Sequence, residues 1–124
     1  MNSLFGPAIH TYTRAEAIAD GSLIDISNTA KEAGITIPIA ITKRVFDFMV
    51  DNESEKDPVA MDWKTYDICS MLVYAAKRLP GNSEMLYPIV RICNGEESNV
   101  NLKATILGGD NGEPVFTVSL PDED

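Results

Sequence analysis

The hydrophobic pattern of the chain changes at Gly81, and this change restricts the fold more than any other feature. Before Gly81, apolar residues recur at the three-and-four spacing of helices that bury one face. After Gly81, apolar and polar residues alternate, as in strands with one buried and one solvated face. The 124 residues suffice for one core, and no repeat or linker divides them. The sequence therefore predicts a single α+β domain over residues 1–124, with helices first and strands last.

Three strands are predicted in the last third of the chain. They cover residues 86–93, 100–106 and 116–120. The connecting loops, 94–98 and 108–112, are rich in turn-forming residues. Consecutive strands joined by such turns pair as an antiparallel meander. We therefore expect N-terminal helices packed on a three-stranded antiparallel meander.

Two helices have clear start and stop signals. Thr13 and Glu16 have the spacing of a capping box, so the first helix should begin there and end at Gly21. The longest predicted helix covers residues 63–79, with Asp62 as its cap. Its apolar stripe consists of Ile68, Met71, Leu72, Ala75, Ala76 and Leu79, widened by Tyr66, Cys69 and Val73. We expect this helix to lie at the centre of the core.

Shorter elements are expected between these two helices. Residues 23–26 form a brief extended run, and Ser27 and Asn28 can cap a short helix that follows. Thr42 can cap a further helix over residues 43–51. A polar loop then leads to the longest helix.

The run 35–41 is rich in β-branched residues and is expected to be extended. Pro38 cannot donate a ladder hydrogen bond. We therefore expect this run to be an edge strand or an irregular stretch, so residues 23–26 and 35–41 are the two places where short extra strands could join the meander.

The charge of the chain excludes some partners. Its 19 Asp and Glu residues outnumber its 10 Lys and Arg residues, for a net charge of −9. Nucleic-acid binders gain affinity by neutralising phosphates, so direct nucleic-acid binding is not expected. No apolar run is long enough for a membrane span, and the first residues do not resemble a secretory signal. We expect a cytoplasmic protein with reduced cysteines, Cys69 and Cys93.

A first candidate site surrounds the single histidine. His10, Tyr12 and Arg14 lie close in sequence, and Asp25 or Glu16 could orient His10 as a general base. Tyr12 and Arg14 are side chains suited to holding a base or a phosphate. The alternative is structural: His10 and Tyr12 anchor the N-terminal segment by hydrogen bonds, and Arg14 pairs with a carboxylate. One histidine does not make a zinc-type site, so no metal and no cofactor are expected.

A second candidate site is acidic. It consists of Asp51, Glu53, Glu55 and Asp57, which could together dock a basic groove on a partner protein. The alternative is that these carboxylates are only solvated. The glycine-rich loop 108–112 precedes a strand, which favours a hairpin turn over a phosphate or calcium site. No motif of a known catalytic class is present.

The two ends of the chain carry a resemblance. The segments IHTYTRAEAIADG (residues 9–21) and GEPVFTVSLPDED (residues 112–124) resemble a family of small, uncharacterised bacterial proteins of plasmids, phages and other mobile elements. The resemblance implies a genomic setting more than a chemistry. Small accessory proteins in that setting often bind host proteins, including defence systems.

These observations lead to one main hypothesis and two rivals. The main hypothesis is a non-catalytic interaction module with an unknown protein partner, acting in its finer form against a host defence system. The first rival is a small-molecule or nucleotide-binding protein, or an enzyme, with a pocket around His10, Tyr12 and Arg14. The second rival is a homo-oligomer that functions by self-association.

Overall fold

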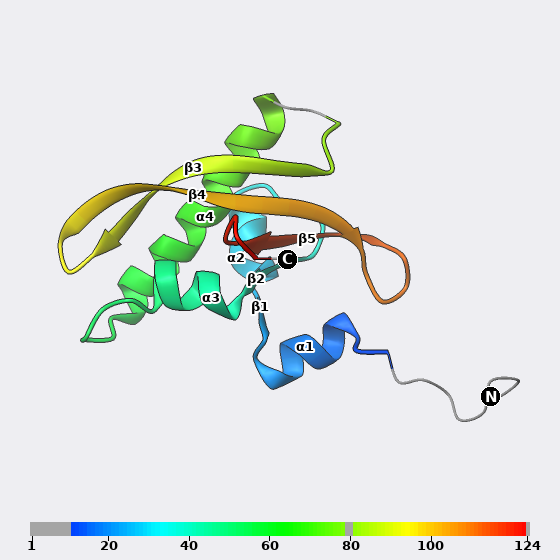
Figure 1. The fold of residues 1–124 in the computed structure, drawn as a ribbon, viewed down its shortest axis with the longest axis horizontal. Helices are drawn as coiled ribbons and strands as arrows, with labels where there is room; N and C mark the ends of the chain where they lie inside the picture. The colour runs from blue at the N-terminus through cyan, green and yellow to red at the C-terminus, as the bar shows by residue number, and fades with distance from the viewer. Residues whose placement is uncertain (1–10, 79–80, 124) are drawn as a thin grey trace, which may run out of the picture.

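The computed structural model describes residues 11–78 and 81–123, arranged around a five-stranded sheet in the order β1-β2-β5-β4-β3 (Figure 1). The strands are β1 (Leu23–Asp25), β2 (Ile39–Thr42), β3 (Glu84–Cys93), β4 (Glu96–Gly108) and β5 (Pro114–Ser119). The helices are α1 (Arg14–Asp20), α2 (Ser27–Glu32), α3 (Lys43–Val45) and α4 (Pro58–Arg78), with a π-helical turn η1 (Phe46–Val50) after α3.

The predicted fold, a three-stranded antiparallel meander covered by N-terminal helices, is wrong. β2 lies between β1 and β5, antiparallel to β1 and parallel to β5, so the sheet is five-stranded and mixed. β2 is an interior strand because Pro38 precedes it instead of interrupting it. The Pro38 carbonyl accepts a hydrogen bond from the Phe116 backbone N–H (2.9 Å). Pro38 thus takes part in the contact with β5 as an acceptor, and the backbone N–H that proline lacks is not needed there.

The last three strands are antiparallel neighbours, with β4 between β3 and β5. β4 begins at Glu96, earlier than the sequence pattern indicates, and its residues 96–105 pair with the whole length of β3. The hairpin turns at Asn94 and Gly95, which both have positive φ (53° and 79°). A turn with two positive φ angles matches the twist of a hairpin, which explains why the pairing continues up to the turn.

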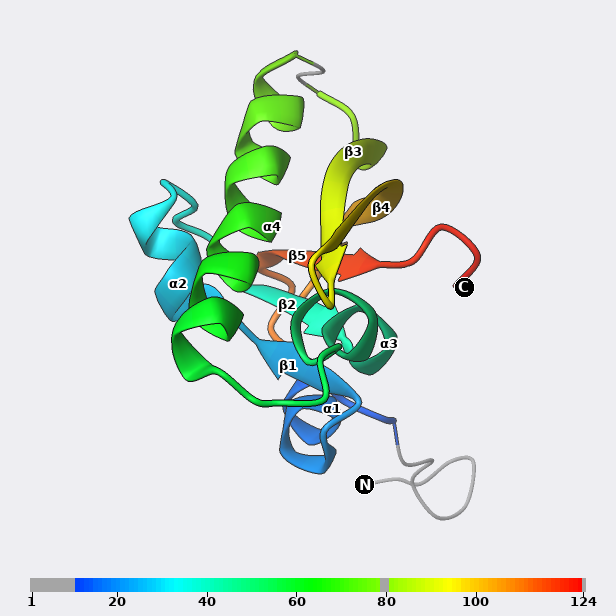
Figure 2. The ribbon, with the colours of Figure 1, turned by 90° about the vertical axis from the view of Figure 1, so that its left-hand side faces the viewer.

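The core lies between one face of the sheet and the helices. Figure 2 shows α4 running along the sheet with α2 beside it. α4 contacts both α2 and the strand β3. Alternate residues of the strands, such as Tyr87, Leu102 and Val118, are buried against Ile68 and Leu72 of α4. The Tyr87 hydroxyl donates to the Ile68 carbonyl (3.1 Å), which satisfies the one polar atom of this fully buried ring.

On the opposite face of the sheet, α1 packs on β1, and its Arg14 side chain reaches β5. Ala17, Ala40 and Val115 are buried but do not belong to the main core. Ala40 and Val115 point away from the main core because neighbouring residues of a strand face opposite sides. α1 therefore lies on the second face of the sheet, at the β1 edge.

The helix ends follow the predicted signals in part. The capping box of α1 is confirmed: the Thr13 hydroxyl accepts from the Glu16 backbone N–H (3.0 Å), and Gly21 is left-handed (φ 86°). The predicted cap at Asp62 is wrong, because α4 already begins at Pro58. Asp57 accepts from the Val59 backbone N–H (3.1 Å), and proline is well suited to the first helical position because its missing N–H has no partner there.

Both cysteines are free thiols, Cys69 in α4 and Cys93 at the end of β3. Burial raises the pKa of the Cys69 thiol from its ordinary value of 9.0 to about 12. Within residues 11–78 and 81–123, no helix has the length and hydropathy of a bilayer-crossing segment.

We expect native protein at pH 8 to react with a thiol reagent at Cys93 first, and at Cys69 only as fast as the chain unfolds. Because the unfolded chain loses the Cys69 proton near pH 9 and the folded chain near pH 12, this thiol should also make stability fall as the pH rises between these values. Absorbance of released thionitrobenzoate measures the labelling. The Cys93→Ser variant should lose the fast phase; a fast phase in that variant would contradict the burial of Cys69.

Candidate functional site

The residues of the first candidate site do not all converge. His10 lies outside the described residues. The Tyr12 hydroxyl contacts the Asp20 carboxylate and Ser22 Oγ (3.1 Å) at the end of α1. The contact with Tyr12 holds the pKa of Asp20 below its ordinary value, and the same contact raises the pKa of Tyr12.

Arg14 extends from the start of α1 to the strand β5. Its guanidinium donates to Thr117 Oγ1 (2.8 Å) and to the Phe116 carbonyl (2.7 Å). Burial lowers the pKa of Arg14, and the nearby carboxylates of Asp25 and Asp110 oppose this shift. Arg14 therefore joins α1 to the sheet. The polar groups of Tyr12 and Arg14 have different partners, and a ligand role for either residue stays a prediction.

Asp25 lies at the end of β1, where its carboxylate accepts from the Ser27 backbone N–H (2.9 Å). This bond supports the start of α2 at Ser27. The sequence pattern had indicated Ser27 or Asn28 as the capping residue of this helix. Asp110 similarly accepts from the Arg14 backbone N–H (2.8 Å) and so fixes the loop 108–112 against α1. Both carboxylates thus have structural partners close to Arg14.

The second candidate site lies in the loop between η1 and α4, and three of its four carboxylates have partners. Asp51 pairs with Lys56, Glu53 accepts from the Asn94 backbone N–H, and Asp57 caps α4. Glu55 makes no hydrogen bond or ion pair with another residue in the described part of the chain. The bond from Asn94 places this acidic loop beside the tip of the β3–β4 hairpin.

Asn52 fixes the position of the acidic loop. Its amide donates to the carbonyls of Phe48 (2.9 Å) and Ile92 (3.0 Å), and its oxygen accepts from the ammonium of Lys64 (2.9 Å). Lys64 is buried in α4, so a single amide connects η1, β3 and α4. A buried ammonium needs such a partner.

Two neighbouring hollows lie between α4 and the edge strand β3, and we refer to them together as the α4–β3 groove. This α4–β3 groove is lined by Trp63, Asp67, Tyr74 and Arg78 of α4 and by Leu86 and Val90 of β3. Its wider end is a cavity of about 450 Å³ beside Tyr74 and Leu86. The Arg78 guanidinium lies 5.4 Å from the centre of the Tyr74 ring and donates to its hydroxyl (2.9 Å). These two contacts restrain the Tyr74 and Arg78 side chains at the surface of the groove.

Asp67 is the carboxylate of the groove, beside Trp63 and Val90. Burial raises the pKa of the Asp67 carboxyl. No hydrogen bond or ion pair joins it to another residue within 11–78 and 81–123. Because desolvation disfavours the charged form, a cationic side chain placed next to Asp67 would stabilise it.

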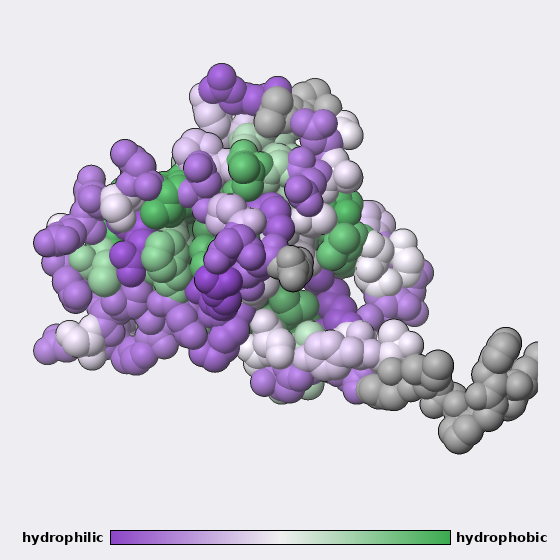
Figure 3. Space-filling view, in the orientation of Figure 1, coloured by the Kyte–Doolittle hydropathy of each residue, from purple (hydrophilic) through white to green (hydrophobic). Residues whose placement is uncertain are grey.

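More carboxylates surround the Trp63 end of the groove. Lys64 lines both the hollow beside Asp67 and the hollow of the acidic loop, so the two are adjacent. Glu96 and Glu97 are exposed opposite Cys93 and Ile92 in the hairpin. Figure 3 shows hydrophilic side chains around this hairpin end, with a few hydrophobic ones between them. This end of the molecule therefore combines exposed apolar anchors with negative charge.

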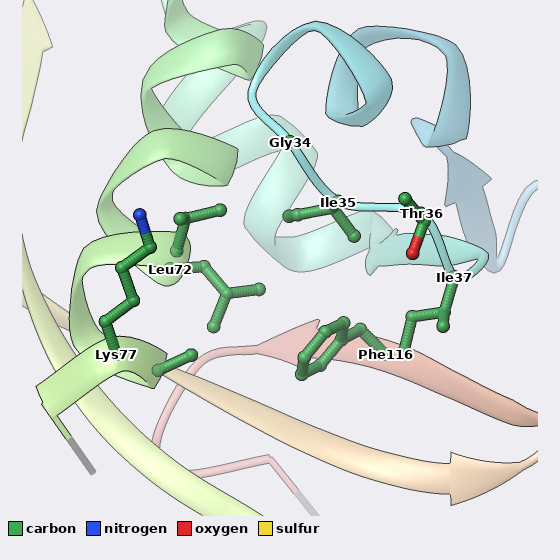
Figure 4. Close-up of a pocket in the computed structure, with 9 residues that line it drawn as sticks. Gly34, Ile35, Thr36, Ile37, Leu72, Lys77 and Phe116 are labelled. Atoms are coloured by element: carbon green, nitrogen blue, oxygen red, sulfur yellow. The ribbon is translucent and has the colours of Figure 1, made fainter. Parts of the chain in front are cut away.

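A separate pocket of about 320 Å³ lies on another side of α4. This Phe116 pocket is lined by Ile35, Thr36 and Ile37 after α2, by Leu72 and Lys77 of α4, and by Phe116 of β5. In Figure 4, Thr36 and Lys77 lie on opposite sides of the pocket, with Ile35, Leu72 and Phe116 between them. The lining is apolar apart from these two side chains and the backbone.

The sequence patterns did not identify the groove. Tyr66 was assigned to the buried stripe of the long helix, yet 43% of it is exposed, and Trp63 is 45% exposed. The available signal was the width of the apolar stripe: a helix that is apolar on most sides cannot bury all of them against one sheet. Among the described residues, no group of three His, Cys, Asp or Glu side chains could hold a metal ion.

Comparison with known proteins gives one match. A family model described as a family of unknown function (DUF6573) matches residues 1–124. No curated protein and no solved structure matches the chain.

Proposed function

Since the chain belongs along its whole length to the family of unknown function DUF6573, we propose its role from its surface: it is a non-catalytic module that binds a protein partner in the α4–β3 groove. The observation that carries this proposal is the exposure of large apolar side chains there. Tyr74 is 57% exposed and Leu86 is 56% exposed, next to a cavity large enough for a side chain of a partner. Contiguous apolar surface of this kind marks interaction sites in soluble proteins.

The composition of the groove also supports an interface. Trp, Tyr and Arg are the residue types that contribute most to binding energy at protein interfaces. The groove holds one or more of each: Trp63 at one end, and Tyr74 stacked with Arg78 at the other. Tyr74 and Arg78 already restrain each other, so less side-chain entropy is lost when a partner binds.

The carboxylates at the Trp63 end of the groove favour a partner with a positively charged segment. Asp67 is desolvated and has no cationic neighbour bonded to it within the described residues. The acidic loop with Glu53 and Glu55 lies next to the same end of the groove. A segment with apolar anchors and a Lys or Arg beside Asp67 fits both features, because the cation would offset the cost of the buried carboxylate.

The genomic setting is a finer part of the proposal. Its support is the resemblance of the chain ends to proteins of mobile elements. An accessory protein of a plasmid or phage benefits from binding a host protein, and a host defence factor is the partner class we propose. Action in the cytoplasm belongs to the same proposal.

Trp63 provides the test, because it is the only tryptophan in the chain. We expect an amphipathic lysine–leucine peptide to shift the Trp63 emission to shorter wavelength, and a glutamate–leucine peptide of equal length to leave it unchanged. Asp67→Asn should weaken binding of the lysine–leucine peptide about tenfold, since a desolvated charge pair contributes roughly 1.5 kcal/mol.

Glu32→Gln is the matched control, because it also removes one negative charge, from the exposed end of α2. It should change the affinity less than twofold. Equal losses in Asp67→Asn and Glu32→Gln would mean that only net charge matters, which contradicts a site in the groove. To identify the partner, a photo-crosslinking phenylalanine at Tyr74 should capture a protein in the producing cell that the same group at Leu107 does not.

A further inference from the structure

We propose that the Phe116 pocket binds a small apolar molecule that carries a carboxylate, independently of a protein partner in the α4–β3 groove. The two sites lie on different sides of α4 and share none of the residues that line them. One can therefore be abolished without the other.

The shape of the pocket follows from the end of α2. Gly34 has a positive φ (98°), which turns the chain away from the helix. The Ile35 backbone N–H then bonds to the Ala30 carbonyl (2.9 Å), so Ile35 is fixed under the turn. Residues 34–37 thus form a wall opposite α4, and the Phe116 ring lies between the two (Figure 4). The pocket is held open by backbone geometry, and a preformed pocket is typical of small-molecule sites.

The lining selects the chemistry of the ligand. Ile35, Leu72 and Phe116 offer an apolar surface, which favours a hydrocarbon chain or ring. The volume of about 320 Å³ accommodates on the order of ten non-hydrogen atoms, if each takes up the roughly 30 Å³ of a water molecule. An octanoate ion has this size.

Lys77 selects the charge of the ligand. Its ammonium is the only charged group that lines the pocket among the described residues, and no hydrogen bond or ion pair joins it to another described residue. The chain has a net charge of −9, so an unpaired ammonium beside an apolar pocket is a specific attraction for an anion. Thr36 lies across the opening and offers a hydroxyl that donates to a carboxylate.

Titration with sodium octanoate, followed by NMR of the full chain, tests the proposal. We expect saturable shifts of the Ile35, Ile37 and Phe116 signals, with a dissociation constant on the order of 1 mM for a ligand of this size. Octanol, the neutral counterpart, should bind about tenfold more weakly. Lys77→Met should reduce octanoate affinity to that of octanol and leave octanol affinity unchanged.

Lys31→Met is the matched control, since it removes an exposed lysine of α2 that does not line the pocket. Ala76→Phe fills the pocket and should abolish the shifts from both probes. The proposal is overturned if octanoate gives no saturable shifts, if octanol binds equally well, or if Lys31→Met has the same effect as Lys77→Met. Tighter binding of an acetylated dipeptide ending in leucine would overturn the small-molecule assignment. None of these results depends on the groove.

Discussion

Replacing Ile41 by alanine is expected to lower the free energy of unfolding by about 3 kcal/mol, the largest single effect we predict in this protein. Ile41 is fully buried in β2 and lies opposite Val118 of β5 and Ile24 of β1. Truncation leaves a cavity in the main core that the neighbouring strands cannot fill, because both are hydrogen-bonded to β2 in a fixed register. Urea unfolding followed by circular dichroism measures the change.

Leu107→Ala is the control for this prediction. Leu107 lies in β4 and is 49% exposed, so its truncation should cost less than about 1 kcal/mol. The comparison tests the mixed sheet directly. Similar costs for Ile41→Ala and Leu107→Ala would contradict the interior position of β2 and its pairing with β5, and would favour the edge strand or irregular stretch expected from the sequence.

Replacing Arg14 by methionine should lower the free energy of unfolding by about 2 kcal/mol. Methionine keeps much of the aliphatic length, but the two charge-assisted hydrogen bonds to Thr117 and to the Phe116 carbonyl are lost. α1 then keeps its contacts with β1 and loses its bond to β5. The effect is smaller than for a fully buried group, because the guanidinium is partly exposed and water replaces some of the lost interaction.

Lys43→Met is the matched control for Arg14. It removes an exposed cation that pairs with Asp47 (2.8 Å) one helical turn away, and it should cost about 0.3–0.5 kcal/mol. The same urea titration compares the two. A double variant of Arg14→Met with Thr117→Val should be less destabilised than the sum of the single changes. If Arg14→Met leaves stability unchanged, the guanidinium is free for a ligand, as one sequence hypothesis held.

The helix α4 uses three of its sides. Ile68 and Leu72 face the sheet, Trp63 and Tyr74 line the groove beside β3, and Lys77 lies at the rim of the Phe116 pocket. This explains why its apolar residues exceed the single stripe of an ordinary surface helix. The excess apolar surface is where both proposed binding sites lie.

Local signals in the sequence were sufficient for elements that depend on a few neighbouring residues. The capping box of Thr13 and Glu16 acts within one helical turn, and Gly21 ends the same helix by its own backbone conformation. The alternation in the last third of the chain likewise identified three antiparallel strands, because successive strand residues face opposite sides. Such signals need no knowledge of distant segments.

The tertiary structure alone determined which segments meet. The parallel pairing of Ile39 with Phe116 and the reach of Arg14 to Thr117 join residues from opposite ends of the chain. No local pattern encodes these contacts, because each joins segments that lie far apart in the sequence. The groove beside β3 arises in the same way: the sequence determined that α4 is apolar on several sides, and only packing on the sheet determined which of them stay exposed.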